Sequence, residues 1–153
     1  MNNFSSNVNI QSSGCGILWN NSFDEVSIKL IVEMKAIEII IQAMKTFESH
    51  QNIQKKGCGS LWNIGVNNYE YQTKIRELKG IEIVVQIMKK FPENEEIQYF
   101  GCGTLWVLSF NNEENKNLIK NLGAFELIKN LETNFPNYQE LHKLANNSLK
   151  ILK

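Results

Sequence analysis

Apolar side chains recur along most of the chain at the spacing of an amphipathic helix. Ile53, Cys58 and Leu61 fall on one face at 3.6 residues per turn. The isoleucine run at 39–41 has the composition of a strand, but its spacing to Met44 and the absence of alternation favour a buried helix. The hydrophobic pattern therefore predicts an all-α protein.

One seven-residue phrase occurs three times. It reads GCGILWN at 14–20, GCGSLWN at 57–63 and GCGTLWV at 101–107, with spacings of 43 and 44 residues. A repeat of this length indicates stacked supersecondary units, each packing on its neighbours, in place of one globular core with a buried catalytic centre. Function is therefore to be sought on a surface that recurs with the repeat.

Each unit is predicted to contain three helices. Gly80 and Gly123 are expected at the break between the first and second helices, at a position where φ is positive. Pro92 and Pro136 end the second helix of the last two units. In the last unit the helices are expected at 113–121, 124–133 and 138–152, and the earlier third helices at 8–22, 52–65 and 93–110.

The expected organisation is one solenoid over residues 1–153. It starts with a tail at 1–7 and an N-terminal third helix at 8–23. Three repeats follow, at 24–66, 67–110 and 111–153.

The pattern resembles the armadillo repeat over nearly the whole chain. Residues 96–109 resemble the third helix of that family, and residues 115–128 resemble its first and second helices with the glycine between them. The resemblance implies an armadillo-type solenoid, a right-handed α-α superhelix of about three three-helix repeats plus an N-terminal lone helix. HEAT repeats rank second, because they normally have two helices and lack this glycine.

Armadillo proteins bind extended peptides along a concave groove lined by their third helices, so the resemblance implies a protein or peptide partner. The family's groove asparagine corresponds to Asn20 and Asn63, and to Val107 in the third unit. An amide can pair with a main-chain N–H and C=O at once; a solvated helix-end residue is the alternative. The family's groove tryptophan, four residues earlier, is replaced by glycine at Gly16, Gly59 and Gly103. The importin-like ladder is thus broken, and recognition of nuclear signals is not implied.

A helical wheel separates the phrase by face. Cysteine and leucine lie on the core side, the second glycine lies beside the asparagine, and the tryptophan lies between the two sides. Trp19, Trp62 and Trp106 form an aromatic stripe, for which packing between repeats is favoured over a ladder that contacts the partner. The glycines either widen the groove or allow close helix approach. Lys55, Tyr99, Asn67 and Asn111 complete the candidate groove.

Charge argues against a dominant electrostatic partner. Sixteen basic and 16 acidic residues give a formal net charge of zero, so nucleic acid is disfavoured. The only sequence features that favour nucleic-acid binding are the pairs Lys55-Lys56 and Lys89-Lys90. No apolar run approaches the roughly 18 to 20 residues of a membrane span, so no membrane partner is expected.

The three cysteines, one per repeat, make a poor disulfide framework. They place the protein in a reducing compartment, the cytoplasm or the nucleus. No base, zinc pair or phosphate loop accompanies them, so we expect no enzyme, no metal and no cofactor. The function predicted is a protein-interaction or scaffold module. The alternative is a structural segment whose ends stack on flanking repeats or on another copy.

Overall fold

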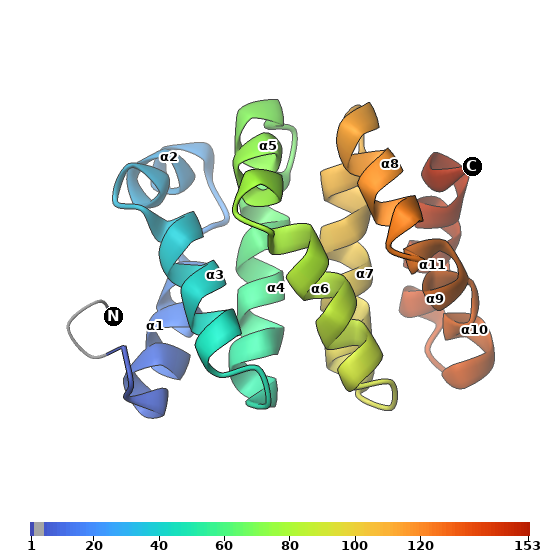
Figure 1. The fold of residues 1–153 in the computed structure, drawn as a ribbon, viewed down its shortest axis with the longest axis horizontal. Helices are drawn as coiled ribbons and strands as arrows, with labels where there is room; N and C mark the ends of the chain where they lie inside the picture. The colour runs from blue at the N-terminus through green and yellow to red at the C-terminus, as the bar shows by residue number, and fades with distance from the viewer. Residues whose placement is uncertain (2–4) are drawn as a thin grey trace.

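The computed structural model describes residues 1 and 5–153 and is built from helices stacked side by side along one axis (Figure 1). In chain order the helices are α1 (Val8–Asn20), α2 (Glu25–Glu33), α3 (Ala36–Thr46), α4 (Gln51–Gly65), α5 (Tyr69–Glu77), α6 (Gly80–Lys90), α7 (Glu95–Ser109), α8 (Glu113–Asn121), α9 (Ala124–Lys129), α10 (Leu131–Asn134) and α11 (Gln139–Leu152). The all-α fold class is confirmed.

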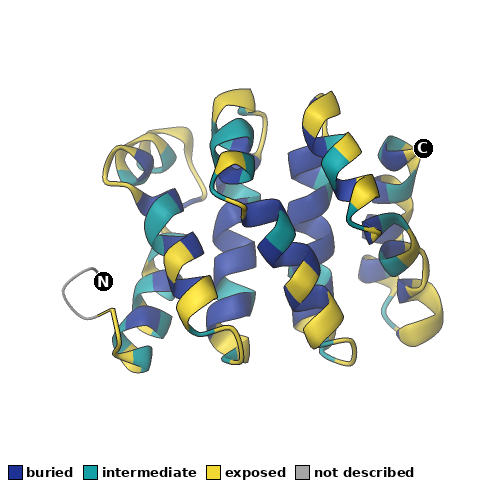
Figure 2. Cartoon of the chain, in the orientation of Figure 1, coloured by how far each residue is buried: buried dark blue, intermediate teal, exposed yellow. Residues whose placement is uncertain are grey.

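The helices repeat in triplets. α1, α4, α7 and α11 form one row in which each packs on the next, and α3, α6 and α9 lie across that row (Figure 1). The core runs between the two rows, where α4 and α7 carry the longest buried surfaces (Figure 2). Cys58, Leu61 and Ile64 lie there with no exposed area. The chain therefore has a stacked core that continues from repeat to repeat.

Asparagine starts many of the helices. The side chains of Asn7, Asn68, Asn94 and Asn112 each accept a hydrogen bond from a backbone N–H three residues later, at 2.9–3.2 Å. Such caps satisfy one of the donors that the first turn of a helix leaves unpaired. The asparagine richness of the chain thus has a structural use at the helix starts.

The expectation that Gly80 has a positive φ is wrong. Lys79 adopts the left-handed conformation (φ 67°), as do Lys35 (φ 62°) and Gly123 (φ 78°) at the equivalent turns. Gly80 begins α6, and a Cβ there would lie 2.6 Å from Cγ2 and 2.9 Å from the carbonyl oxygen of Ile75. This glycine allows close approach of α5 and α6.

The helix expected at 124–133 is interrupted. α9 ends at Lys129 and α10 begins at Leu131, with Asn130 between them. Asparagine is a weak helix former because its side chain competes for backbone hydrogen bonds.

Candidate functional site: the third-helix face

The phrase repeated in the sequence places a tryptophan of one repeat on a glycine of the next. A Cβ on Gly59 would lie 2.8 Å from Cε2 and 2.9 Å from Nε1 of Trp19, and a Cβ on Gly103 would overlap the ring of Trp62. Both glycines are buried. They therefore do not expose backbone to a partner, because an indole covers each one.

Five aromatic side chains join along α1, α4, α7 and the start of α11. We call the surface that they form, with Lys55, Asn63 and Glu96, the third-helix face. The aromatic cluster consists of Trp19, Trp62, Tyr99, Phe100 and Tyr138. Trp19 meets Phe100 edge to face at 4.8 Å between ring centroids, and Tyr99 stacks on Tyr138 at 5.6 Å. All five side chains are half-buried, so each leaves part of its ring accessible.

Trp106 has a different environment. Trp62 packs on Gly103, which follows it by 41 residues. The residue at the same spacing after Trp106 is Asn147, which is not a glycine. Trp106 lines an apolar hollow together with Trp62, Val66, Asn67, Val107 and Phe110. Since no glycine is available to receive it, the last tryptophan borders an open space.

The three positions of the family's groove asparagine differ from one another. Asn20 is exposed, whereas Asn63 is half-buried and its Nδ2 donates to Ser22 Oγ at 3.2 Å. Val107 is 7% exposed. The three positions therefore do not form a uniform row of free amides.

Asn67 and Asn111 lie in the turns after α4 and α7 and are exposed. Their φ angles are 52° and 53°, a left-handed conformation that asparagine tolerates better than most residues. Asn67 borders the hollow of Trp106, and with Asn63 and Tyr71 it also borders a second, more polar hollow beside Ser22.

Charged groups on the third-helix face and beside it are paired within the chain. Lys55 Nζ lies 2.9 Å from Glu96 Oε2, and Lys56 Nζ donates to the carbonyl oxygen of Ser12 at 3.1 Å. Lys56 also lies over Gly16, whose Cβ would be 3.3 Å from its Nζ. Burial, followed by the neighbouring Tyr99 and Glu140, raises the pKa of Tyr138.

The cysteine thiols lie in the core. Burial raises the pKa of Cys15 to about 11 and that of Cys58 and Cys102 to about 12. They stay protonated at neutral pH and are poor nucleophiles and metal ligands. Within residues 1 and 5–153, no group of three or more His, Cys, Asp or Glu side chains is placed to hold a metal ion, and no helix is long and apolar enough to cross a bilayer.

Sequence reasoning missed Phe100 and Tyr138. Phe100 immediately precedes the repeated phrase, but its counterparts are Ser13 and Lys56, so it does not recur. Tyr138 occupies the N-cap position of α11 without a side-chain capping hydrogen bond, and since the equivalent positions of α4 and α7 hold His50 and Asn94, it does not recur either. The available signal was an aromatic residue directly before the last copy of the phrase, for Phe100, and at the start of the last predicted third helix, for Tyr138.

The comparisons with known proteins bear on the fold. No protein-family profile and no curated protein sequence matches the chain. Among solved structures, a designed armadillo repeat protein superposes with a TM-score of 0.82 at 16% identity, covering 94% of this chain and 58% of that one. An engineered protein from a structural genomics consortium gives a TM-score of 0.82 at 20% identity, covering 97% and 58%. The chain thus spans less than two thirds of either protein. At these identities the likeness concerns the fold alone, and it shows that this chain has the armadillo-like repeat fold.

Proposed function

We propose that this chain is a protein-interaction module that binds a peptide segment of a partner protein along the third-helix face. The observation that carries the proposal is the aromatic cluster, whose five half-buried rings are held together at centroid distances of 4.8–6.3 Å. Aromatic side chains are enriched at protein interfaces because they bury large areas and have few rotatable bonds.

The hollow beside Trp106 supplies a place for one apolar side chain of the partner. Its walls are Trp62, Trp106 and Val107, and Val66 and Phe110 are exposed at its edge. Such a side chain would bury the accessible part of the two indoles. The hollow would therefore anchor the peptide, while the aromatic cluster provides the longer contact surface.

Asn63 would contact the partner's backbone through its carbonyl oxygen. Its Nδ2 already donates to Ser22 Oγ, while Oδ1 has no hydrogen bond within the described part of the chain. An amide fixed in this way presents an acceptor to a main-chain N–H. Asn20, which is exposed, supplies the corresponding group one repeat earlier.

The lysine pairs favour a protein partner over nucleic acid. Lys55 pairs with Glu96 and Lys90 with Glu48, at 2.9 and 3.2 Å. Lys56 and Lys89 donate to backbone carbonyl oxygens, those of Ser12 and Leu122. Since each of these four ammonium groups already has an intramolecular partner, the two lysine pairs offer no unpaired cations to phosphates.

A binding role without catalysis agrees with the raised pKa values of the three cysteine thiols. We propose that the protein is located in the cytoplasm or the nucleus, where thiols stay reduced. We propose repeat boundaries at 24–66, 67–110 and 111–153, preceded by the helix at 8–23.

The test is a selection of peptides on the whole chain from a displayed random library, followed by affinity measurements by fluorescence anisotropy. We expect Lys55→Glu to weaken the selected peptides about tenfold, which corresponds to about 1.4 kcal/mol. Asn63→Ala should weaken them by a similar factor.

Lys90→Glu is the matched control. Like Lys55→Glu it reverses one lysine of an inter-repeat ion pair, but it lies at the end of α6, outside the third-helix face. Equal affinities for all three variants, with unchanged thermal midpoints, would exclude the third-helix face as the binding surface.

A further inference from the structure

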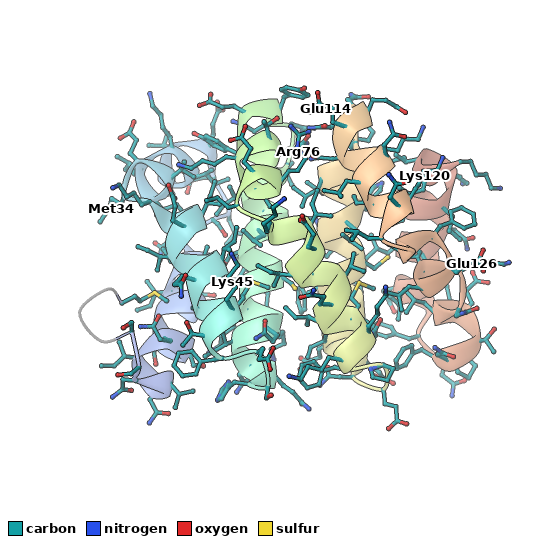
Figure 3. The ribbon with its side chains drawn as sticks, in the orientation of Figure 1. Met34, Lys45, Arg76, Glu114, Lys120 and Glu126 are labelled. Carbon is teal, nitrogen blue, oxygen red and sulfur yellow. The ribbon has the colours of Figure 1, made fainter. Side chains whose placement is uncertain are left out.

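The N-terminal end of the solenoid exposes a contiguous apolar surface. Ile17, Leu30 and Met34 are 62%, 55% and 75% exposed. They line one hollow together with Leu18, Ile31 and Ile39. Figure 3 labels Met34, whose side chain points outward at this end of the molecule. We call this surface, formed by α1, α2 and α3, the N-terminal end face.

The N-terminal end face carries no ionisable side chain among the residues that line its hollow, which otherwise include Asn21, Ser27 and Ala36. At the other end of the solenoid, Phe125 and Leu149 lie among Lys129, Lys150 and Lys153. A head-to-tail contact would remove three ammonium groups from water against a hollow whose lining holds no acid. The lining of this hollow is therefore complementary to another apolar surface.

The N-terminal end face also differs from the surfaces where repeats stack within the chain. At the position of Ile17 the following repeats have Ser60 and Thr104. Thr104 Oγ1 donates to the carbonyl oxygen of Cys58 at 2.9 Å, and Ser60 Oγ to that of Cys15 at 3.5 Å. Isoleucine offers no hydroxyl and is larger, so it disfavours the close approach of another third helix.

Met1 already fills the innermost part of this end. Its side chain covers Gly14, as Met44 covers Gly57 and Met88 covers Gly101. Its carbonyl oxygen accepts from Gln11 Nε2 at 2.8 Å, as that of Met44 accepts from Gln54 Nε2 at 3.0 Å. The apolar area left uncovered is thus the outer part, around Leu30 and Met34.

We propose that two copies of this chain pair through their N-terminal end faces about a two-fold axis. Such an axis sets the apolar outer part of this face against its own copy, buries Leu30 and Met34 of both copies and closes the assembly at two. The three exposed apolar side chains of the face, Ile17, Leu30 and Met34, are far fewer than the roughly 20–30 residues a side of a standard interface. The dimer should therefore be weak, with a Kd on the order of 10 µM.

Sedimentation equilibrium at several concentrations of the whole chain tests the pairing. The wild type should change from monomer to dimer and no further, and Leu30→Glu and Met34→Glu should stay monomeric. Tyr69→Glu is the control, because Tyr69 is similarly exposed (59%) but lies on α5. A wild type that stays monomeric, growth beyond a dimer, or dimers unaffected by both variants would overturn the proposal.

A cysteine placed near the axis tests the symmetry. Met34→Cys should form a disulfide with the same residue of a second copy under a mild oxidant, while Tyr69→Cys should not. The native thiols are buried and do not compete. A Met34→Cys variant that crosslinks no faster than Tyr69→Cys would contradict a two-fold pairing. These substitutions lie outside the third-helix face, so their outcome is independent of the proposed peptide binding.

Discussion

Alanine substitutions at the second glycine of the phrase should change stability with opposite signs in different repeats. A helical glycine costs about 0.5–1 kcal/mol relative to alanine. At Gly16 an added Cβ meets only the flexible end of Lys56, at 3.3 Å from Nζ. Gly16→Ala should therefore stabilise the protein by up to about 0.5–1 kcal/mol.

At Gly59 the added Cβ would lie 2.8 Å from Cε2 of Trp19, and an indole is rigid. Overpacking of this kind typically costs about 1–3 kcal/mol, which exceeds the gain in helix propensity. The net loss for Gly59→Ala should be about 1–2 kcal/mol, and Gly103→Ala should lose more because its Cβ would overlap the ring of Trp62.

Urea unfolding followed by circular dichroism measures these changes. A second series in a Trp19→Ala background separates the two effects, because there Gly59→Ala should become neutral or stabilising. The reasoning is refuted if Gly59→Ala stabilises the wild type as Gly16→Ala does, or if its cost remains without the indole.

Two further predictions concern backbone strain and the buried thiols. Lys79→Gly should stabilise the protein by up to about 1 kcal/mol, because Lys79 is left-handed at φ 67°; a lower unfolding midpoint in urea would contradict this. Cys58 and Cys102 should resist a thiol reagent at pH 8 until the chain unfolds. Because burial raises their pKa from 9.0 to about 12, the unfolded state releases protons first, so stability should fall as pH rises from about 9 towards 12. A flat urea midpoint over that range would contradict the assignment.

The architecture follows from the sequence because the same phrase is repeated. A phrase that returns after 43 and 44 residues specifies stacked units, and the helical period assigns Cys58 and Leu61 to the core, where both are fully buried. The third helix predicted at 52–65 is observed at Gln51–Gly65. Local periodicity was sufficient for these features because each depends on residues within one unit.

Features that depend on contacts between repeats could not be predicted from the helical periodicity of the sequence. A glycine can be required either by a positive φ or by a close contact with a neighbouring element, and the sequence does not distinguish these two requirements. Gly80 was therefore expected to have the positive φ that Lys79 adopts. Likewise, Gly59 and Gly103 looked free to shape a groove, whereas indoles from the preceding repeat cover them. Phe100 enters the aromatic cluster through a contact with Trp19, 81 positions earlier, which no repeat spacing encodes.

That last contact bears on how the solenoid unfolds. In most repeat proteins each unit touches only its immediate neighbours, so segments can open from an end one at a time. Trp19 reaches across α4 to Phe100 on α7, at 4.8 Å between ring centroids. Opening of α1 therefore also exposes a ring two units away. We expect amide exchange in α1 and α7 to be energetically coupled, so that fraying at the N-terminus is less independent than a nearest-neighbour description allows.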